Sequence, residues 1–182
     1  MIPYRDREEH LILFLNHIHP ILMRQQIIYG IYVIEQAGEM KFNRALLFNV
    51  GYVEALKDFP HWDCFIFHDV DHMPEDDRNL YRCAEGPRLM AVAVDKWKYT
   101  HFYPDFFGAV TAISRTQFEL LNGFSNQFWG WGGEDDDMYE RIKYAQLKVT
   151  RCSKDIDRYQ ISEKGMRISQ TMMLCPFDKN IL

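Results

Sequence analysis

CFIFHDVD, residues 64–71, joins a short apolar run directly to two aspartates. The run 64–67 is short and apolar, which predicts a buried strand. In an extended i, i+2 arrangement, Asp69 and Asp71 point to the same side of the chain. Two carboxylates at a strand end suit Mg²⁺ or Mn²⁺, and such an ion binds a diphosphate in turn. Aspartate pairs in loops are more often turn or surface residues, so this motif alone does not assign a site.

Strands and helices alternate along the chain on both sides of this stretch. Apolar spacing predicts helices over residues 7–25 (interrupted at Pro20), 43–56, 114–121 and 134–147, and further strands over 27–35, 89–94 and 108–113. This order predicts an α/β domain with a mainly parallel sheet. Ligands of such sheets lie beyond the carboxyl ends of the strands, so we expect the acidic motifs to converge on one cleft.

Composition restricts the class of protein. The chain has 182 residues, of which 47% are hydrophobic, and this predicts one globular domain. A net charge of -5 argues against nucleic-acid binding, which needs a basic surface. The sequence has no apolar stretch long enough to span a bilayer and no signal peptide at its start.

The cysteines are Cys64, Cys83, Cys152 and Cys175, and none forms a CxxC pair, which makes a structural zinc site improbable. Cys64 and Cys83 flank the aspartate motif. From spacing alone, a disulfide between them and two buried free thiols are about equally compatible with the sequence.

A second motif, WGWGGEDDD at residues 129–137, places two indoles and three glycines before four acids. Acids in the first turn of a helix are favoured by the helix dipole, and this explains the four acids alone. It does not explain the tryptophans and glycines. A carboxylate beside an indole and a glycine loop is suited to act as general base toward a sugar hydroxyl.

Two further segments combine arginine with an aromatic neighbour. They are Pro3-Tyr4-Arg5-Asp6-Arg7 and Phe42-Asn43-Arg44. Such pairs suit a nucleotide, with the ring against the base and the guanidinium on phosphate. His68, His72 and His101 could be metal ligands, although a lone histidine usually is not one.

Taken together, these segments resemble the β-1,4-galactosyltransferase family (family 7 glycosyltransferases), whose members adopt the GT-A fold. The resemblance runs from Ile2 to about Cys152 and rests on IPYRDREEH, YGIYVIEQAG, FNRALLFNVG, DVDHMP and WGWGGEDDD. It implies a partial glycosyltransferase catalytic domain over residues 1–152 and a divergent tail over 153–182. The family's first strand, C-terminal part, stem and membrane anchor are not recognised in this sequence.

The resemblance implies an inverting, Mn²⁺-dependent transfer of galactose, or N-acetylgalactosamine, from its UDP-sugar to the 4-hydroxyl of a terminal GlcNAc or glucose. Asp135 matches the catalytic base, Glu134 a donor-sugar contact and Asp71 the metal ligand. Gly133, Asp135 and Asp136 match the acceptor site. A disulfide from Cys64 to Cys83 and the Golgi lumen are implied as well. The residues that match the UDP-sugar site are Pro3, Tyr4, Arg5, Arg7, Phe42, Arg44, Val70, Lys96, Tyr103, Phe106 and Trp131.

Some positions depart from the family pattern. The family has a further metal-binding histidine after the acidic helix, whereas this sequence has none after His101. Phe106 stands where galactosyl enzymes carry tyrosine, and Ala109 replaces the second glycine of a Gly-Gly pair, which leaves the donor sugar open. Two alternatives therefore stand beside the enzyme: a UDP-sugar-binding or scaffold protein impaired in catalysis, and a carboxylate-metal hydrolase.

Overall fold

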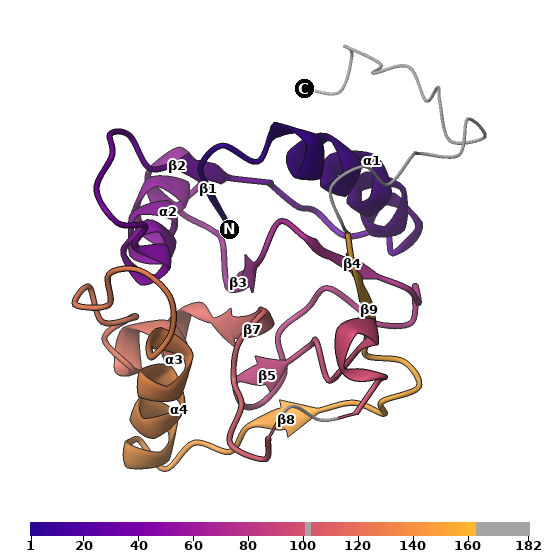
Figure 1. Ribbon diagram of the computed structural model, residues 1–182. Coiled ribbons are helices and arrows are strands. Elements are labelled where there is room, and N and C mark those ends of the chain that lie inside the picture. Colours follow the sequence, from indigo (N-terminus) through magenta and orange to yellow (C-terminus); the bar gives the residue numbers. More distant parts are fainter. Residues whose placement is uncertain (101–102, 163–182) are drawn as a thin grey trace.

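The computed structural model describes residues 1–100 and 103–162, and Figure 1 shows their arrangement. The helices are α1 (Glu8–Arg24), α2 (Arg44–Asp58), α3 (Arg115–Leu120), α4 (Glu134–Tyr144) and a 3-10 turn, η1 (Asp95–Trp97). The strands are β1 (Ile2–Tyr4), β2 (Val33–Glu35), β3 (Cys64–His68), β4 (His72–Pro74), β5 (Arg88–Leu89), β6 (Ala93–Val94), β7 (Val110–Ser114), β8 (Thr150–Arg151) and β9 (Arg158–Ile161).

The sheets are mixed. The four-stranded sheet has the order β3-β7-β5-β8, in which β7 is antiparallel to both neighbours and only β5 and β8 are parallel. The pairs β1-β2 and β6-β9 are parallel, and β4-β9 is antiparallel. The α/β class is confirmed, but the prediction of a mainly parallel sheet is wrong. The crossover to a parallel neighbour is usually an α-helix, and among the described residues between β3 and β7 the chain forms only short strands and η1.

Helices cover both faces of the strands. One apolar cluster contains Phe14, Ile18 and Leu22 of α1, and the other contains residues of α2, α3 and α4, such as Phe48, Phe118 and Met138. In Figure 1, α1 lies beside β4, while α3 and α4 lie together on the far side of β7. Strands β5 and β7 are therefore buried on both sides, which accounts for the apolar sequence of β7, whereas β2 and β8 are partly exposed.

Local sequence signals set most helix boundaries. The side chain of Asn43 accepts a hydrogen bond from the Leu46 amide and so caps α2. Ser114 and Gln117 form a reciprocal capping box at α3. The predicted interruption at Pro20 is wrong, because α1 continues through it to Arg24. The buried residues Ile18, Ile21 and Leu22 flank Pro20, and their packing outweighs the lost hydrogen bond.

Two predicted strands are shorter than expected. Of residues 27–35 only Val33–Glu35 is a strand, because β1 pairs with these residues alone. The predicted strand 89–94 is divided between β5 and β6, which belong to different sheets.

The predicted disulfide between Cys64 and Cys83 is confirmed, and Cys152 is a free, exposed thiol. Cys175 and His101 lie outside the described residues. Within the described part of the chain, no helix has the length and apolar character needed to cross a bilayer.

Candidate functional site

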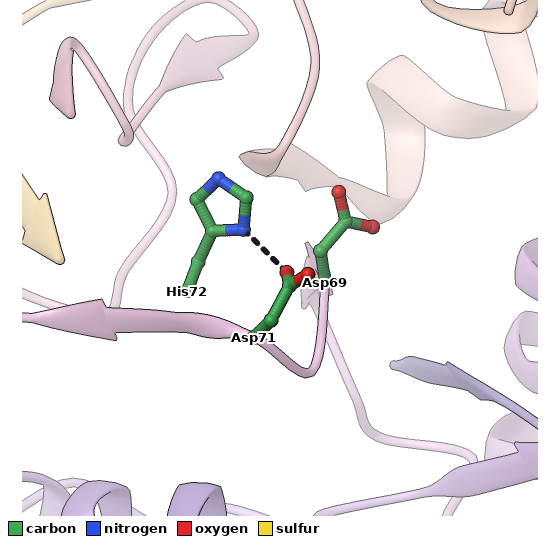
Figure 2. A group of neighbouring side chains, drawn as sticks. All are labelled: Asp69, Asp71 and His72. Carbon is green, nitrogen blue, oxygen red and sulfur yellow. Dashed lines mark hydrogen bonds and ion pairs between the residues drawn. The ribbon is translucent and has the colours of Figure 1, made fainter. Parts of the chain in front are cut away.

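The aspartate motif forms a turn between β3 and β4. Ligand atoms of Asp69, Asp71 and His72 lie within 4.8 Å of one another. Figure 2 shows the His72 ring directed at Asp71, with Nδ1 2.9 Å from Oδ1. Burial pushes the pKa of Asp71 upward, but His72 and the nearby Arg7 outweigh it and hold that pKa at about 2. Carboxylate oxygens with one imidazole nitrogen form a donor set that fits Mn²⁺.

Arg44, at the start of α2, joins the two acidic motifs. Its Nε donates to Asp69 Oδ1 at 2.6 Å, and its Nη1 donates to Asp135 Oδ1 at 2.8 Å and lies 3.4 Å from Glu134 Oε1. The guanidinium also lies over the Phe48 ring, 4.6 Å from its centroid. Burial alone would lower the pKa of Arg44, but the three carboxylates raise it. One fixed cation therefore holds together carboxylates from the turn after β3 and from the start of α4.

Asp135 is a largely buried acid whose pKa is raised. Burial raises its pKa from 3.8 to about 6, since the repulsion of Asp69 and Glu134 adds to burial while Arg44 opposes both. The carboxylate lies against Gly108: a β-carbon built there would be 2.1 Å from Asp135 Oδ2. Position 108 thus accepts no side chain while Asp135 stays in place. A carboxylate with a pKa of about 6 is suited to general-base catalysis near neutral pH.

The predicted nucleotide residues gather near this cluster from two elements. Arg5 follows β1 and lies 5.3 Å from the Phe42 ring centroid, and Arg7 Nη1 lies 3.5 Å from Asp71 Oδ2. Pro3 and Tyr4 lie within β1. The structure thus brings both arginine-aromatic segments to the aspartate turn.

The second motif places its residues at the start of α4. Gly133 precedes the helix with a φ of 95°, a left-handed conformation that favours glycine. Tyr103 donates a hydrogen bond to Asp136 Oδ1 at 2.5 Å, and its ring contacts Phe106 edge to face.

Other predicted residues lie apart from the cluster. Trp131 is 97% exposed, and Lys96 is exposed on η1; the described residues show no contact between either side chain and Arg44. Val70 is buried in the apolar cluster beneath α1. The roles of all three toward a nucleotide sugar stay predictions.

Two residues of the site were candidate metal ligands from the sequence, but the family resemblance matched neither of them to a role. Asp69 pairs with Arg44, and His72 contacts Asp71. The i, i+2 spacing indicated Asp69, whereas adjacency to Asp71 was the only signal for His72.

Comparisons with known proteins identify the family of the chain. A model of the N-terminal region of glycosyl transferase group 7 matches residues 1–84, and one described as the N-terminal domain of galactosyltransferase matches residues 88–164. β-1,4-Galactosyltransferase 4 of Rattus norvegicus is 51% identical over 177 residues, which cover 95% of this chain and 51% of that protein. β-1,4-Galactosyltransferase 6 of Homo sapiens is 52% identical over 160 residues, covering 88% and 42%. The chain spans about half the length of these relatives.

Solved structures extend the agreement to the fold. The catalytic domain of Drosophila β-1,4-galactosyltransferase 7 in complex with xylobiose superposes with a TM-score of 0.72 at 38% identity, covering 82% of this chain and 62% of that one. A mutant of that enzyme, in complex with manganese, UDP-Gal and xylobiose, gives 0.73 at the same identity and coverage. The fold is therefore the GT-A type, and the chain belongs to the group 7 glycosyltransferases, the family of the β-1,4-galactosyltransferases.

Proposed function

We propose that this chain binds a UDP-sugar and transfers galactose to the 4-hydroxyl of a terminal GlcNAc or glucose. The observation that carries the proposal is the convergence on Arg44 of Asp69, Glu134 and Asp135, next to the Asp71-His72 pair. A donor with a diphosphate needs a metal site such as the Asp71-His72 pair, and an acceptor hydroxyl needs a base such as Asp135. Transfer between them requires the two sites to lie side by side. N-Acetylgalactosamine remains the alternative donor sugar.

In this proposal each part of the site has a distinct task. Asp135 takes the proton from the acceptor hydroxyl, and Arg44 fixes its carboxylate in position. Arg5, Arg7 and Phe42 bind the nucleotide, and Glu134 binds the donor sugar.

Asp71, with Asp69 and His72 beside it, would hold Mn²⁺. When bound, such an ion offsets negative charge on the departing diphosphate. Asp136, oriented by Tyr103, and Gly133 would contact the acceptor, with Trp131 covering it.

The test is UDP release from UDP-galactose and from UDP-GalNAc with Mn²⁺, over a set of GlcNAc, glucose and xylose acceptors. Asp135→Asn should lower kcat by about 10²–10⁴-fold and leave UDP affinity nearly unchanged. Asp137→Asn is the matched control, because Asp137 lies on the same turn of α4 but pairs with Arg141. Loss of UDP binding together with transfer would make Asp135 a structural residue and refute its role as base.

A UDP-sugar-binding protein without transfer is the second candidate. It is favoured by the absence of any histidine after His101 in the sequence. Calorimetry separates the two, since UDP binding that ignores Mn²⁺ supports the second candidate and strong coupling supports the enzyme. The disulfide between Cys64 and Cys83 suits an oxidising compartment, and we propose the Golgi lumen.

A further inference from the structure

His68, the last residue of β3, lies directly before the aspartate turn and has a buried imidazole. Its Nδ1 lies 2.8 Å from the Asp69 carbonyl oxygen, and its Nε2 lies 2.9 Å from the Tyr81 hydroxyl. Phe14 of α1 packs edge to face against the ring, with 4.7 Å between the ring centroids. The imidazole is therefore held between the aspartate turn and Tyr81, with one nitrogen directed at each.

These two hydrogen bonds determine which nitrogen of His68 carries the proton. A carbonyl oxygen can only accept, so Nδ1 must be protonated to donate to Asp69. Burial lowers the pKa of His68 to about 3, so the ring is neutral and Nε2 has a free lone pair. Tyr81 therefore donates its hydroxyl proton to Nε2, and the oxygen of Tyr81 is left to act as an acceptor.

A chain of buried hydrogen bonds continues from Tyr81 to Arg88 of β5. Tyr159 of β9 donates its hydroxyl proton to the Tyr81 oxygen, 3.2 Å away, and accepts from Asn79 Nδ2 at 3.3 Å. Asn79 Oδ1 accepts from Arg88 Nη2 at 2.7 Å, and a guanidinium can only donate. Every donor in this chain thus points toward His68, and the two ends of the chain require the same direction.

The Asp69 carbonyl, which accepts from the imidazole, also closes the aspartate turn. The His72 amide donates to it at 3.2 Å, so residues 69–72 form a four-residue turn. The Asp69 amide donates to the Ala109 carbonyl at 3.0 Å, and the Ser162 amide donates to the Asp71 carbonyl at 2.8 Å. The turn carries the side chains drawn in Figure 2, so the position of its closing carbonyl affects the directions of Asp69 and Asp71.

We propose that His68 is a positioning residue of the metal site, which holds the Asp69 carbonyl so that Asp69 and Asp71 can share one ion, and that the buried chain from Arg88 keeps its proton on Nδ1. If the proton moved to Nε2, lone pairs of Nδ1 and of the Asp69 oxygen would face each other across 2.8 Å, and the turn would have to move. His68 itself would touch neither the ion nor the substrate. This role rests on the proposed Mn²⁺ site.

The experiment compares four variants of the full chain with the wild type. Tyr81→Phe removes the donor to Nε2. His68→Asn keeps a donor for the Asp69 carbonyl, because the asparagine amide nitrogen takes about the place of Nδ1, whereas His68→Leu keeps none. Tyr29→Phe is the matched control, since Tyr29 forms a hydrogen bond of the same kind with His19 Nδ1, at 2.8 Å and outside the chain.

Three measurements are made on each protein. The affinity for Mn²⁺ is obtained from the electron paramagnetic resonance of the free ion, and the state of the turn from hydrogen exchange of the His72 amide. The ¹⁵N chemical shifts of His68, recorded without Mn²⁺, report which ring nitrogen carries the proton. Thermal unfolding is also followed, because both His68 variants lose the ring and its packing.

We expect the wild-type ring to be protonated at Nδ1. The dissociation constant for Mn²⁺ should rise by about 5- to 10-fold in Tyr81→Phe and by about 10- to 100-fold in His68→Leu, with faster exchange at His72. It should stay within about twofold of the wild type in His68→Asn and in Tyr29→Phe. A role in stability alone would affect His68→Asn and His68→Leu alike.

The possible failures can be told apart. A wild-type chain that binds no Mn²⁺ refutes the proposed metal site, and the role of His68 with it. If the wild type binds Mn²⁺ and His68→Leu binds it equally tightly, only the role of His68 is refuted, and an equal loss in His68→Asn and His68→Leu refutes it as well. A wild-type ring protonated at Nε2 overturns the proposal without any variant, so a substitution that prevents folding does not protect it.

Discussion

Gly108→Ala tests whether the close approach of Asp135 to Gly108, just before β7, matters for catalysis. The added β-carbon would lie 2.1 Å from Asp135 Oδ2 and 2.4 Å from its Cγ. Ordinary contact begins near 3.4 Å, so the carboxylate must move by roughly 1.3 Å. The φ of Gly108 is not among the positive values, so alanine is acceptable to the backbone itself. The substitution therefore displaces one carboxylate and leaves the chain path unstrained.

A displacement of about 1 Å in a catalytic group lowers kcat by about 10²-fold. We expect that loss for Gly108→Ala in transfer of labelled galactose, with UDP affinity measured by calorimetry changed by less than about threefold. Overpacking should also lower the free energy of unfolding by about 1–3 kcal/mol.

Asp135→Ala removes the group that the new methyl meets, so it supplies the control. Gly108→Ala should cost much less stability in the Asp135→Ala background than in the wild-type chain. The reasoning is refuted if Gly108→Ala keeps kcat within threefold, or if its cost in stability is the same in both backgrounds.

Three further predictions concern pH, a buried ion pair and a strained residue. First, kcat should rise with pH through an apparent pKa of about 6, because the base must be ionised and the pKa of Asp135 is raised from 3.8 to about 6. The affinity for UDP should stay constant over that pH range. An inflection of kcat near pH 4 would contradict the assignment of Asp135 as the base. Second, Asp157→Asn should lower the free energy of unfolding, measured in urea, by about 3–5 kcal/mol, because Asp157 is fully buried and lies 3.0 Å from Arg88. Asp76→Asn is the control at the exposed pair with Arg78, and it should lower the free energy of unfolding by no more than about 1 kcal/mol. Third, Ala109→Gly should raise Tm by about 2–4 °C, because Ala109 has a φ of 59°, a left-handed conformation that favours glycine. Ala112→Gly, in the middle of β7, is the control and should lower Tm. A lower Tm for both variants would show that the left-handed conformation of Ala109 carries no strain.

Features that depend on neighbouring residues could be predicted from the sequence. Asn43 and Ser114 begin helices because their side chains reach amides three residues further on, and that spacing is visible in the sequence. The disulfide between Cys64 and Cys83 followed from family resemblance, because spacing alone left it open. The convergence of the two acidic motifs was expected from the rule that ligands bind at strand ends, although that rule was applied to a mainly parallel sheet and the observed sheet is mixed.

Features that depend on distant pairing could not be predicted in this way. The direction of β7 relative to β3 depends on how the chain returns between them, and nothing in VTAIS encodes it. Residues 27–32 have the composition of a strand, but pairing needs a neighbour that composition cannot supply. Arg44 was assigned to phosphate, and its contacts with acids 25 and 91 positions away arise only from packing.

The sharing of Arg44 among three carboxylates has a consequence for how this site can change over evolutionary time. When Asp69 or Glu134 is neutralised, the Arg44 guanidinium interacts more strongly with the acids that remain. The effect of substituting one of these acids therefore depends on which residues occupy the other two acidic positions. Loss of Arg44 before any of the acids exposes three like charges to one another, whereas loss of an acid first does not. The order of substitutions therefore matters at this site, and loss of Asp69 or Glu134 while Arg44 remains costs less electrostatic repulsion than loss of Arg44 while all three acids remain.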